Sequence, residues 1–134
     1  MSLIDEIKKS EGFRNRVYQC TEGFDTIGYG FAIKDLVMDE DIAEMILERK
    51  IAELRLRIEQ KFDFFSGLPK KVQDVVIEMC YQMGVSGFSK FRKTIQYLKD
   101  HEFECAGIEM LDSRWAKQTP NRAKKLSDIV KYAK

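Results

Sequence analysis

The stretch "EGFRNRVYQCTEGFDTIGYG", residues 11–30, holds the densest group of chemically useful side chains in the sequence. It starts with a glutamate, has a cysteine in its middle, and ends with a threonine followed by two glycines. Turn-forming residues alternate with short apolar runs along it, which is typical of a small antiparallel hairpin or meander. Because helical patterns lie on both sides of this stretch, it predicts an α+β fold rather than an all-helical one.

A helix is predicted on each side of the β region. Residues 3–11 place Ile4 and Ile7 on one face, and Gly12 stands at the usual position after a helix end. Residues 39–62 return to helical spacing, with charged residues around one apolar stripe. That stripe consists of Leu47, Ile51, Leu54, Ile58 and Phe62.

The rest of the chain predicts a helical lobe. Pro69 suits the first turn of a helix that ends at Gly84, and two or three short helices follow. Thr119 as cap and Pro120 as first helical residue mark the start of the last helix. The inner face of the helix after Pro69 is predicted to contain Val72, Val75, Val76, Met79, Cys80 and Met83.

These elements predict one mostly helical α+β domain of two lobes. We expect a small β lobe over residues 12–38, a connecting helix over residues 39–62, and a helical lobe over residues 66–134 that also includes the helix of residues 3–11. A cleft between two such lobes is a usual place for a functional site.

Composition excludes several classes of protein. The 134 residues are 44% apolar and 34% charged, with 23 basic against 22 acidic side chains, which argues against disorder. No apolar run resembles a secretory signal or a membrane span. The basic residues are enriched after Leu111, so this end could bind an anionic polymer. They are Arg114, Lys117, Arg122, Lys124, Lys125, Lys131 and Lys134.

The cysteines and the histidine do not form a recognisable metal or disulfide pattern. Cys20, Cys80 and Cys105 are odd in number and widely spaced, and His101 is the one histidine. We therefore expect no metal, no cofactor and no Ser-His-Asp triad.

Several residues of the opening stretch have both a functional and a structural interpretation. Glu11 falls at a helix C-terminus, where a charged carboxylate is disfavoured, as suits a general acid, although it could be a solvated surface residue. Gly28 and Gly30 share one face of a predicted strand with Thr26, which lets a ligand or another backbone approach closely. Cys20 could be a small buried hydrophobe, or an exposed thiol that ionises or holds a water.

These residues also carry a family resemblance. Glu11, then eight residues, Cys20, then five, and Thr26 in "TIGYG" resemble the active-site pattern of the phage-type lysozymes, glycoside hydrolase family 24. The resemblance resumes at "YQMG", residues 81–84, and is strongest at "SRWAKQTPNRAKK", residues 113–125. The family usually has aspartate at the middle position and in some members cysteine.

The resemblance implies an enzyme that hydrolyses the β-1,4 bond between N-acetylmuramic acid and N-acetylglucosamine in bacterial peptidoglycan. Glu11 would be the general acid, Thr26 would help to position the attacking water, and Cys20 would stand at the aspartate position. The implied substrate residues are Tyr81 and Gln82 lining the cleft, Thr94 on its rim, and Arg114, Trp115, Gln118 and Arg122 supporting or extending the site.

Some of these roles stay open. A thiol near pKa 8.5 is only a few per cent ionised at pH 7. Cys20 would therefore act in one of three ways: as a thiolate whose ionisation the surroundings favour, as a neutral group that orients water, or together with a nearby acid, Glu22 or Asp25. Trp115 and Tyr81 could be packing residues, Arg122 a solvated charge, and "TPNR" a capping signal alone. The segment after Ile33 is also shorter than in the best-known member of the family, and Phe31 stands where that enzyme has histidine, so no ion pair is expected there.

The resemblance further implies a phage endolysin that works as a monomer. It would be made in the host bacterial cytoplasm without a signal peptide and reach the wall after a holin-dependent membrane lesion. Its partner would be bacterial peptidoglycan, with no nucleic acid and no membrane insertion. One alternative is a lysozyme-like module that binds peptidoglycan with little or no catalysis. Another is a helical protein that binds nucleic acid through the basic C-terminal end.

Overall fold

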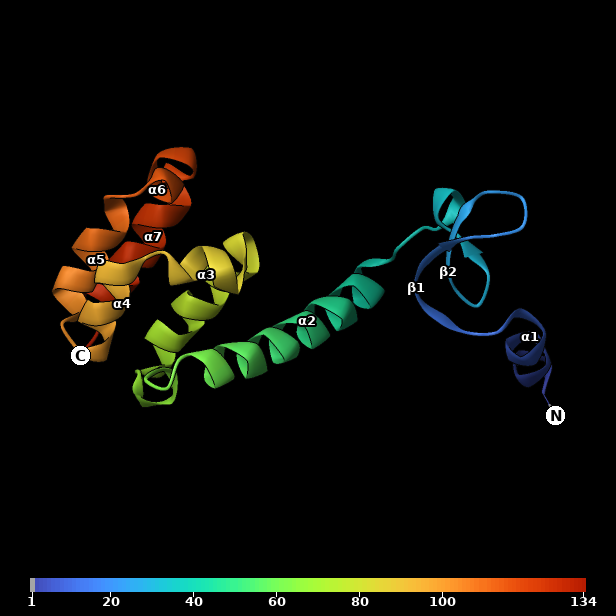
Figure 1. Ribbon diagram of the computed structural model, residues 1–134, viewed down its shortest axis with the longest axis horizontal. Coiled ribbons are helices and arrows are strands. Elements are labelled where there is room, and N and C mark those ends of the chain that lie inside the picture. Colours follow the sequence, from blue (N-terminus) through green and yellow to red (C-terminus); the bar gives the residue numbers. More distant parts are fainter. Residues whose placement is uncertain (1) are drawn as a thin grey trace. The chain divides into compact units, whose positions relative to one another are not determined.

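The computed structural model describes residues 2–134 and divides the chain into two compact units. The first runs to Glu44 and the second from Met45 to Lys134. Figure 1 labels the elements along the chain. No helix within residues 2–134 combines the length and the apolar character needed to cross a membrane.

The first unit starts with helix α1, Leu3–Glu11, which has the predicted bounds. Ser2 begins it with a capping box: the backbone N–H of Asp5 donates to Ser2 Oγ at 3.2 Å, and the Asp5 carboxylate accepts from the backbone N–H of Ser2. At the other end, the N–H of Gly12 donates to the carbonyl of Lys8 at 2.9 Å. These two local signals explain why the helix begins at Leu3 and ends at Glu11.

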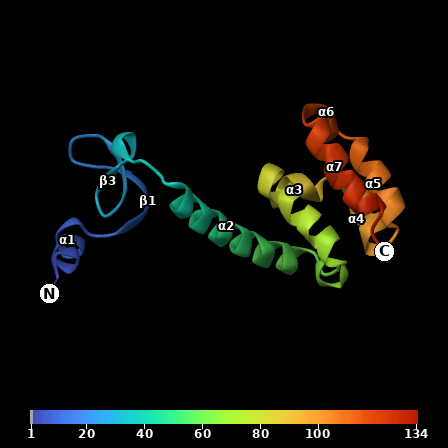
Figure 2. The same cartoon turned by 180° about the vertical axis from the view of Figure 1, so that it is seen from behind.

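The predicted meander is a three-stranded antiparallel sheet with strand order β1-β2-β3. Its strands are β1 (Arg14–Gln19), β2 (Asp25–Gly28) and β3 (Phe31–Ala32), and Figure 2 labels the third strand. Thr26 on the middle strand pairs with Tyr18 on β1. An irregularity in the pairing between Arg14 and Tyr18 bends the first strand.

The prediction that Gly28 and Gly30 share one strand face is wrong. β2 ends at Gly28, and Gly30 lies in the turn before β3. Both residues have positive φ, 71° and 76°, because the chain reverses direction between them. A Cβ at Gly28 would lie 2.7 Å from the Phe31 ring, so a side chain, not a neighbouring backbone, approaches it.

A short 3₁₀ turn, η1 (Ile33–Asp35), leads to the long helix α2, Glu40–Lys61. The boundary between the units falls within the first turns of α2. In the second unit by itself, the predicted apolar stripe is covered only toward its C-terminal end, where Ile58 and Phe62 are buried and Leu54 is partly buried. Its N-terminal part is exposed.

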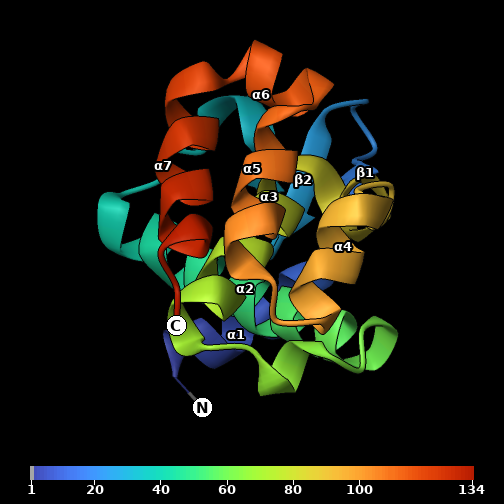
Figure 3. The same cartoon turned by 90° about the vertical axis from the view of Figure 1, so that its left-hand side faces the viewer.

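The second unit is helical after α2. Its elements are η2 (Phe65–Gly67), α3 (Lys70–Ser89), α4 (Arg92–Lys99), α5 (Phe103–Leu111), α6 (Arg114–Gln118) and α7 (Pro120–Lys131). Helix α5 lies against both α4 and α7, as Figure 3 shows. The approach to α7 is close at Gly107, where an added Cβ would lie 2.7 Å from the Ser127 carbonyl oxygen.

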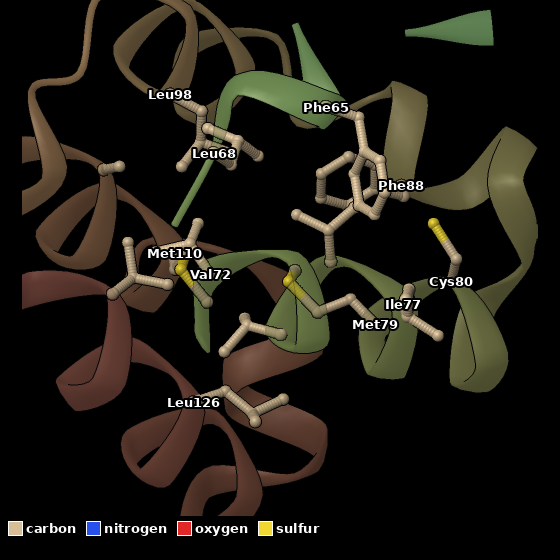
Figure 4. Close-up of a cluster of buried hydrophobic side chains, with 14 of the residues drawn as sticks. Phe65, Leu68, Val72, Ile77, Met79, Cys80, Phe88, Leu98, Met110 and Leu126 are labelled. Atoms are coloured by element: carbon tan, nitrogen blue, oxygen red, sulfur yellow. The ribbon is translucent and has the colours of Figure 1, made fainter. Parts of the chain in front are cut away.

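The buried core of the second unit gathers around α3 (Figure 4). The predicted inner face of that helix is confirmed, since all its members are buried except Met83, which is partly buried against the same cluster. Gly84 interrupts the helix with φ 82° and ψ 159°, and the chain then resumes helical geometry up to Ser89. The predicted stop at Gly84 is therefore a kink.

The predicted α+β class is confirmed: a small antiparallel sheet precedes a long helix and a set of shorter helices. The predicted association of residues 3–11 with residues 66–134 concerns the arrangement of the two units and stays a prediction. One capping prediction needs a correction. Thr119 precedes Pro120 as expected, but its hydroxyl donates to the carbonyl of Trp115 at 3.0 Å and does not cap α7.

Candidate active site

The Glu11 carboxylate lies against the backbone of the β2–β3 turn. Glu11 is the last residue of α1 and is exposed in its own unit. A Cβ at Gly30 would lie 2.5 Å from Glu11 Oε2 and 3.1 Å from its Cδ. The absence of a side chain at Gly30 therefore gives the carboxylate its place beside the turn.

Cys20 follows β1 directly and begins a short loop that leads into β2. The N–H of Cys20 donates to the carbonyl of Phe24 at 3.0 Å, and the N–H of Gly23 donates to the carbonyl of Cys20 at 2.9 Å. These two bonds close the loop through backbone atoms alone. The backbone that carries the thiol is consequently held in place, and Cys20 is half-buried, with access to solvent.

Thr26 lies on the middle strand and is 4% exposed. Its hydroxyl donates to the Phe24 carbonyl at 2.9 Å, so the same carbonyl holds both Thr26 and the backbone of Cys20. Because the hydroxyl has one proton and gives it to Phe24, its oxygen remains an acceptor. A water beside Thr26 can thus donate to this oxygen.

The environment favours the ionised form of Cys20. Backbone hydrogen bonding from Phe24, and then from Glu22, lowers the pKa of the Cys20 thiol below its ordinary value. Thr26 has a smaller effect in the same direction. Since the single Thr26 proton is given to Phe24, we assign the lowered pKa to the two backbone contacts.

The Cys80 thiol is in the opposite situation. Cys80 is 2% exposed, and burial raises the pKa of its thiol to about 12. It therefore matches the description of a small buried hydrophobe, which Cys20 does not.

Phe31 belongs to an aromatic group on the outer side of the turn. The rings of Tyr29 and Phe31 are 6.4 Å apart edge to face, and those of Phe13 and Tyr29 are 5.4 Å apart. Lys8 Nζ lies 5.7 Å from the centre of the Tyr29 ring. Phe31 therefore takes part in aromatic packing, and the cation–π contact of this group is made by Tyr29.

In the second unit, Trp115 is joined to Gln82. Trp115 is 7% exposed, and its Nε1–H donates to Gln82 Oε1 at 2.9 Å. Because an indole N–H only donates, the Gln82 amide must turn its oxygen toward Trp115. The amide nitrogen of Gln82 then keeps its two N–H donors for another partner. Trp115 is too buried to be a stacking platform for a sugar.

Arg122 is joined to α3 in a similar way. Its Nε donates to Glu78 Oε2 at 2.8 Å, and the two side chains are 39% and 45% exposed. Glu78 and Gln82 are four residues apart on α3 and so lie on one face of it. This face therefore accepts hydrogen bonds from both ends of the segment that carries the family resemblance.

Tyr81 is exposed and lines a hollow of about 470 Å³ between α2 and α3. Two basic side chains and one acidic side chain stand around the hollow. Its lining consists of Lys50, Glu53, Leu54, Arg57, Cys80, Tyr81 and Gly84. A polar group of a ligand could enter here beside the phenol of Tyr81.

Thr94 lines a second hollow, of about 360 Å³, where α4 begins and α5 ends. Thr94 is 1% exposed, so little of its side chain reaches the surface of that hollow, and its predicted place on the rim of a cleft between lobes stays a prediction. Its hydroxyl is buried and has no hydrogen bond within residues 2–134. Arg114 and Gln118, the other predicted substrate residues, are exposed at the two ends of α6.

Sequence reasoning missed two residues that hold the predicted ones. Gly30 was considered for its strand position, whereas its contact is with Glu11. The sequence pattern does not single out Glu78, although Glu78 lies four residues before Gln82 and so shares a helix face with it. The predicted catalytic residues lie in the first unit and the predicted substrate residues in the second.

Comparison with known proteins identifies the family of the chain. A family model described as "Phage lysozyme" matches residues 8–131. "Probable T4-type lysozyme 1" and "Probable T4-type lysozyme 2" of Dictyostelium discoideum are 24% and 28% identical to the chain. These two similarities each cover 96% of the chain, and 93% and 92% of the respective relatives.

A third relative contains a similar segment within a longer protein. The "Pre-baseplate central spike protein Gp5" of Enterobacteria phage T4 is 26% identical over 97% of the chain, which spans 28% of that protein.

A small antiparallel sheet, a long helix and a helical unit define a lysozyme-like α+β protein. The chain belongs to the phage lysozyme family. It is therefore a glycoside hydrolase that acts on peptidoglycan.

Proposed function

We propose that the enzyme cleaves the β-1,4 bond between N-acetylmuramic acid and N-acetylglucosamine, with Glu11 as the general acid. The observation that carries this proposal is the close approach of the Glu11 carboxylate to Gly30. Glu11 also belongs to the same unit as Cys20 and Thr26. An acid at a fixed position beside a side-chain-free turn can reach a bulky glycan without a steric barrier.

The reaction then needs a proton donor and a water. Glu11 gives its proton to the oxygen of the leaving sugar as the glycosidic bond breaks and positive charge develops on the other sugar. Thr26 accepts a hydrogen bond from the attacking water, because its own proton is held by Phe24. One water is consumed: its oxygen bonds to the sugar carbon, one of its protons passes to the anion beside it, at Cys20 or at Glu22 or Asp25, and the Glu11 carboxylate is reprotonated from solvent.

Cys20 supports the charge that develops on the sugar. Its lowered pKa increases the thiolate fraction at neutral pH, and a thiolate near the ring stabilises positive charge as a carboxylate does. A neutral thiol that orients water, with Glu22 or Asp25 supplying the charge, is the alternative form of this step.

The residues of the second unit are proposed to hold the glycan chain. The free amide N–H groups of Gln82 suit a sugar carbonyl or hydroxyl, and Trp115 keeps them turned outward. The full set comprises Tyr81, Gln82, Thr94, Arg114, Trp115, Gln118 and Arg122. Of these, Trp115 and Thr94 are buried and would act by supporting their neighbours.

Substitution of Glu11 by Gln tests the proposal. The amide keeps the shape but cannot donate the proton of an acid, so lysis of a peptidoglycan suspension should fall by at least about 100-fold. Glu6→Gln is the matched control, because Glu6 lies on the same helix, is exposed, and should keep lysis within a few-fold of the parent. Clearing of the suspension by Glu11→Gln at the parental rate would remove Glu11 from the mechanism.

The same assay separates the enzyme from a module that only binds. A chain that sediments with the wall yet never clears the suspension would support the alternative of a binding module. Product analysis should yield fragments with a reducing-end N-acetylmuramic acid. Fragments that end in N-acetylglucosamine would place the cut at the other glycosidic bond.

We also propose an endolysin role, with the chain as a monomer that meets neither nucleic acid nor the membrane interior. It would be made in a bacterial cytoplasm and reach the wall after a holin-type lesion. Expression in bacteria should leave cells intact until the membrane is permeabilised. Lysis without permeabilisation, or an elution volume of a dimer, would contradict the respective parts of this proposal.

A further inference from the structure

Glu78 holds one of the proposed substrate residues through a side chain of its own. Glu78 Oε2 accepts from Arg122 Nε at 2.8 Å, across 44 residues of sequence and between α3 and α7. The other ion pairs within residues 2–134 are i,i+4 contacts inside single helices. Among the ion pairs of these residues, the Glu78–Arg122 pair is therefore the one that joins two elements.

The contact occupies only part of the Arg122 guanidinium. A guanidinium has five N–H donors in a planar fork, and Glu78 takes the single one on Nε. The two Nη atoms with their four N–H groups lie outside this contact. Holding Nε restricts where the fork can lie and so restricts the directions in which the Nη groups can donate.

Stability alone does not account for this pair. Both side chains are more than a third exposed, and ion pairs with such exposure contribute little to the free energy of unfolding. Gln82, one turn after Glu78 on α3, is in a similar situation. Its amide oxygen accepts from Trp115, and its amide N–H groups stay unused as donors. One face of α3 therefore orients two donor groups from a segment that the family resemblance marks as functional.

We propose that Glu78 is a positioning residue that aims the Nη groups of Arg122 at a carboxylate of peptidoglycan. A planar fork binds a carboxylate through two parallel hydrogen bonds, which is the recognition mode that gains most from a fixed plane. This inference rests on the proposed function, because it names the substrate group that Arg122 holds.

Kinetics on peptidoglycan with separate kcat and KM test the inference. Glu78→Ala and Arg122→Ala should each raise KM about tenfold, the usual cost of one charge-assisted hydrogen bond, with kcat unchanged. Glu78→Gln keeps an oxygen that accepts from Nε, so its KM should stay within about twofold of the parent. The double variant Glu78→Ala/Arg122→Ala should be no worse than Arg122→Ala alone, because the two residues act as one unit.

A second substrate identifies the group that is bound. Peptidoglycan whose carboxylates have been converted to amides should raise the parental KM to that of Arg122→Ala, and should leave the KM of the variants unchanged. Equal losses on both substrates would overturn the assignment of a carboxylate. Arg122→Lys keeps the charge but lacks the fork, and a parental KM for it would overturn the inference even if Glu78→Ala failed to fold.

Two further variants distinguish a failure of the positioning role from a failure of the proposed mechanism. Asp128→Ala removes the exposed partner of Lys124 on the same helix as Arg122 and should behave as the parent. Glu11→Gln should lose lysis whatever Glu78 does, so its failure would reject the proposed mechanism and not the positioning role. Three outcomes would each reject the positioning role. They are a parental KM in Glu78→Ala, a KM in Glu78→Gln as high as in Glu78→Ala, and additive increases of KM in the double variant.

Discussion

At the scale of single residues, Cys20 shows how a backbone loop can change the chemistry of a side chain. The loop from Cys20 to Phe24 is closed by main-chain hydrogen bonds, and backbone hydrogen bonding also lowers the pKa of the thiol. A thiol in that setting carries more negative charge at neutral pH than a free cysteine does. A cysteine at the position where the resemblance implies an aspartate is thus compatible with an anion there.

Alkylation should separate the cysteines by their surroundings. Cys20 should react readily, and its rate should rise with pH and level off below the pH at which an ordinary cysteine levels off, because the thiolate is the reacting form. Cys80, with a pKa of about 12, should react slowly. A Cys105→Ser background removes the exposed third thiol, and mass spectrometry with a lysis assay gives both readouts.

The activity of modified and substituted Cys20 completes that test. Alkylation of Cys20 should abolish lysis, Cys20→Asp should preserve or raise it, and Cys20→Ala should lower it. A folded Cys20→Ala enzyme with full activity would show that the thiol only packs.

Thr94 offers a test of stability that is independent of catalysis. Its hydroxyl is buried without a hydrogen bond, and an unpaired buried polar group costs about 1–3 kcal/mol. Thr94→Val should therefore raise the free energy of unfolding by about 1 kcal/mol in urea titrations, with an unchanged dependence on urea concentration. Parental lysis by this variant would remove Thr94 from the proposed substrate residues.

Thr119→Val is the matched control for that experiment. The Thr119 hydroxyl donates to the carbonyl of Trp115 at 3.0 Å, so its removal should lower stability by about 1 kcal/mol. Two variants with the same chemistry should thus shift stability in opposite directions. A loss of stability in Thr94→Val would mean that its hydroxyl has a partner after all.

At the scale of elements, local signals predicted helices better than turns. Gly12 and the Ser2–Asp5 pair are sufficient to define α1, because caps act within one helical turn. The alternation of Gly28 and Gly30 suggested a strand, but their positive φ values place them in a chain reversal. Glycine permits both conformations, so the sequence pattern alone cannot distinguish them.

The contact between α5 and α7 depends on the lack of a side chain at Gly107. An added Cβ would meet backbone atoms of Ser127 and Lys131 at 2.7 and 2.9 Å, and backbone cannot move aside as a flexible side chain can. Gly107→Ala should therefore lower the free energy of unfolding by about 1–3 kcal/mol, despite the better helix propensity of alanine.

Gly67→Ala provides the comparison in thermal unfolding experiments. Nothing lies within 4 Å of a Cβ at Gly67, so that variant should be neutral or slightly more stable. Equal midpoints for the Gly107 and Gly67 variants would show that the two helices can separate without cost.

At the scale of the whole molecule, the near-zero net charge conceals a basic C-terminal end. Seven Lys or Arg residues follow Leu111 in the sequence, with Asp112 and Asp128 as the acids among them. Lysis should decline as salt shortens the screening length from about 10 Å to about 3 Å, since wall polymers are anionic. Exchange of Lys124 and Lys125 for Gln should weaken the dependence of lysis on salt. Lysis by the parent that does not change with salt would show that these charges do not contribute to binding of the wall.

The candidate site was predictable only in part. Glu11, Cys20 and Thr26 are candidates because their spacing resembles a known pattern, and their catalytic roles stay a prediction. The sheet register explains why Thr26 and the Cys20 loop meet. The role of Glu78 was not predictable, because α3 carries several charged residues and the sequence does not say which one faces Arg122. Tertiary contacts between distant elements decide such roles.

Because of the hydrogen bond between Trp115 and Gln82, the fluorescence of Trp115 should report on glycan binding. The sequence contains one tryptophan, so all indole fluorescence comes from a ring that is buried against Phe91 and donates its N–H to a proposed glycan-binding amide. A wall fragment that draws the Gln82 amide toward itself would change the polarity around that indole. Binding can then be followed by emission wavelength on the unlabelled parent protein, and no other ring contributes to the signal at long excitation wavelengths.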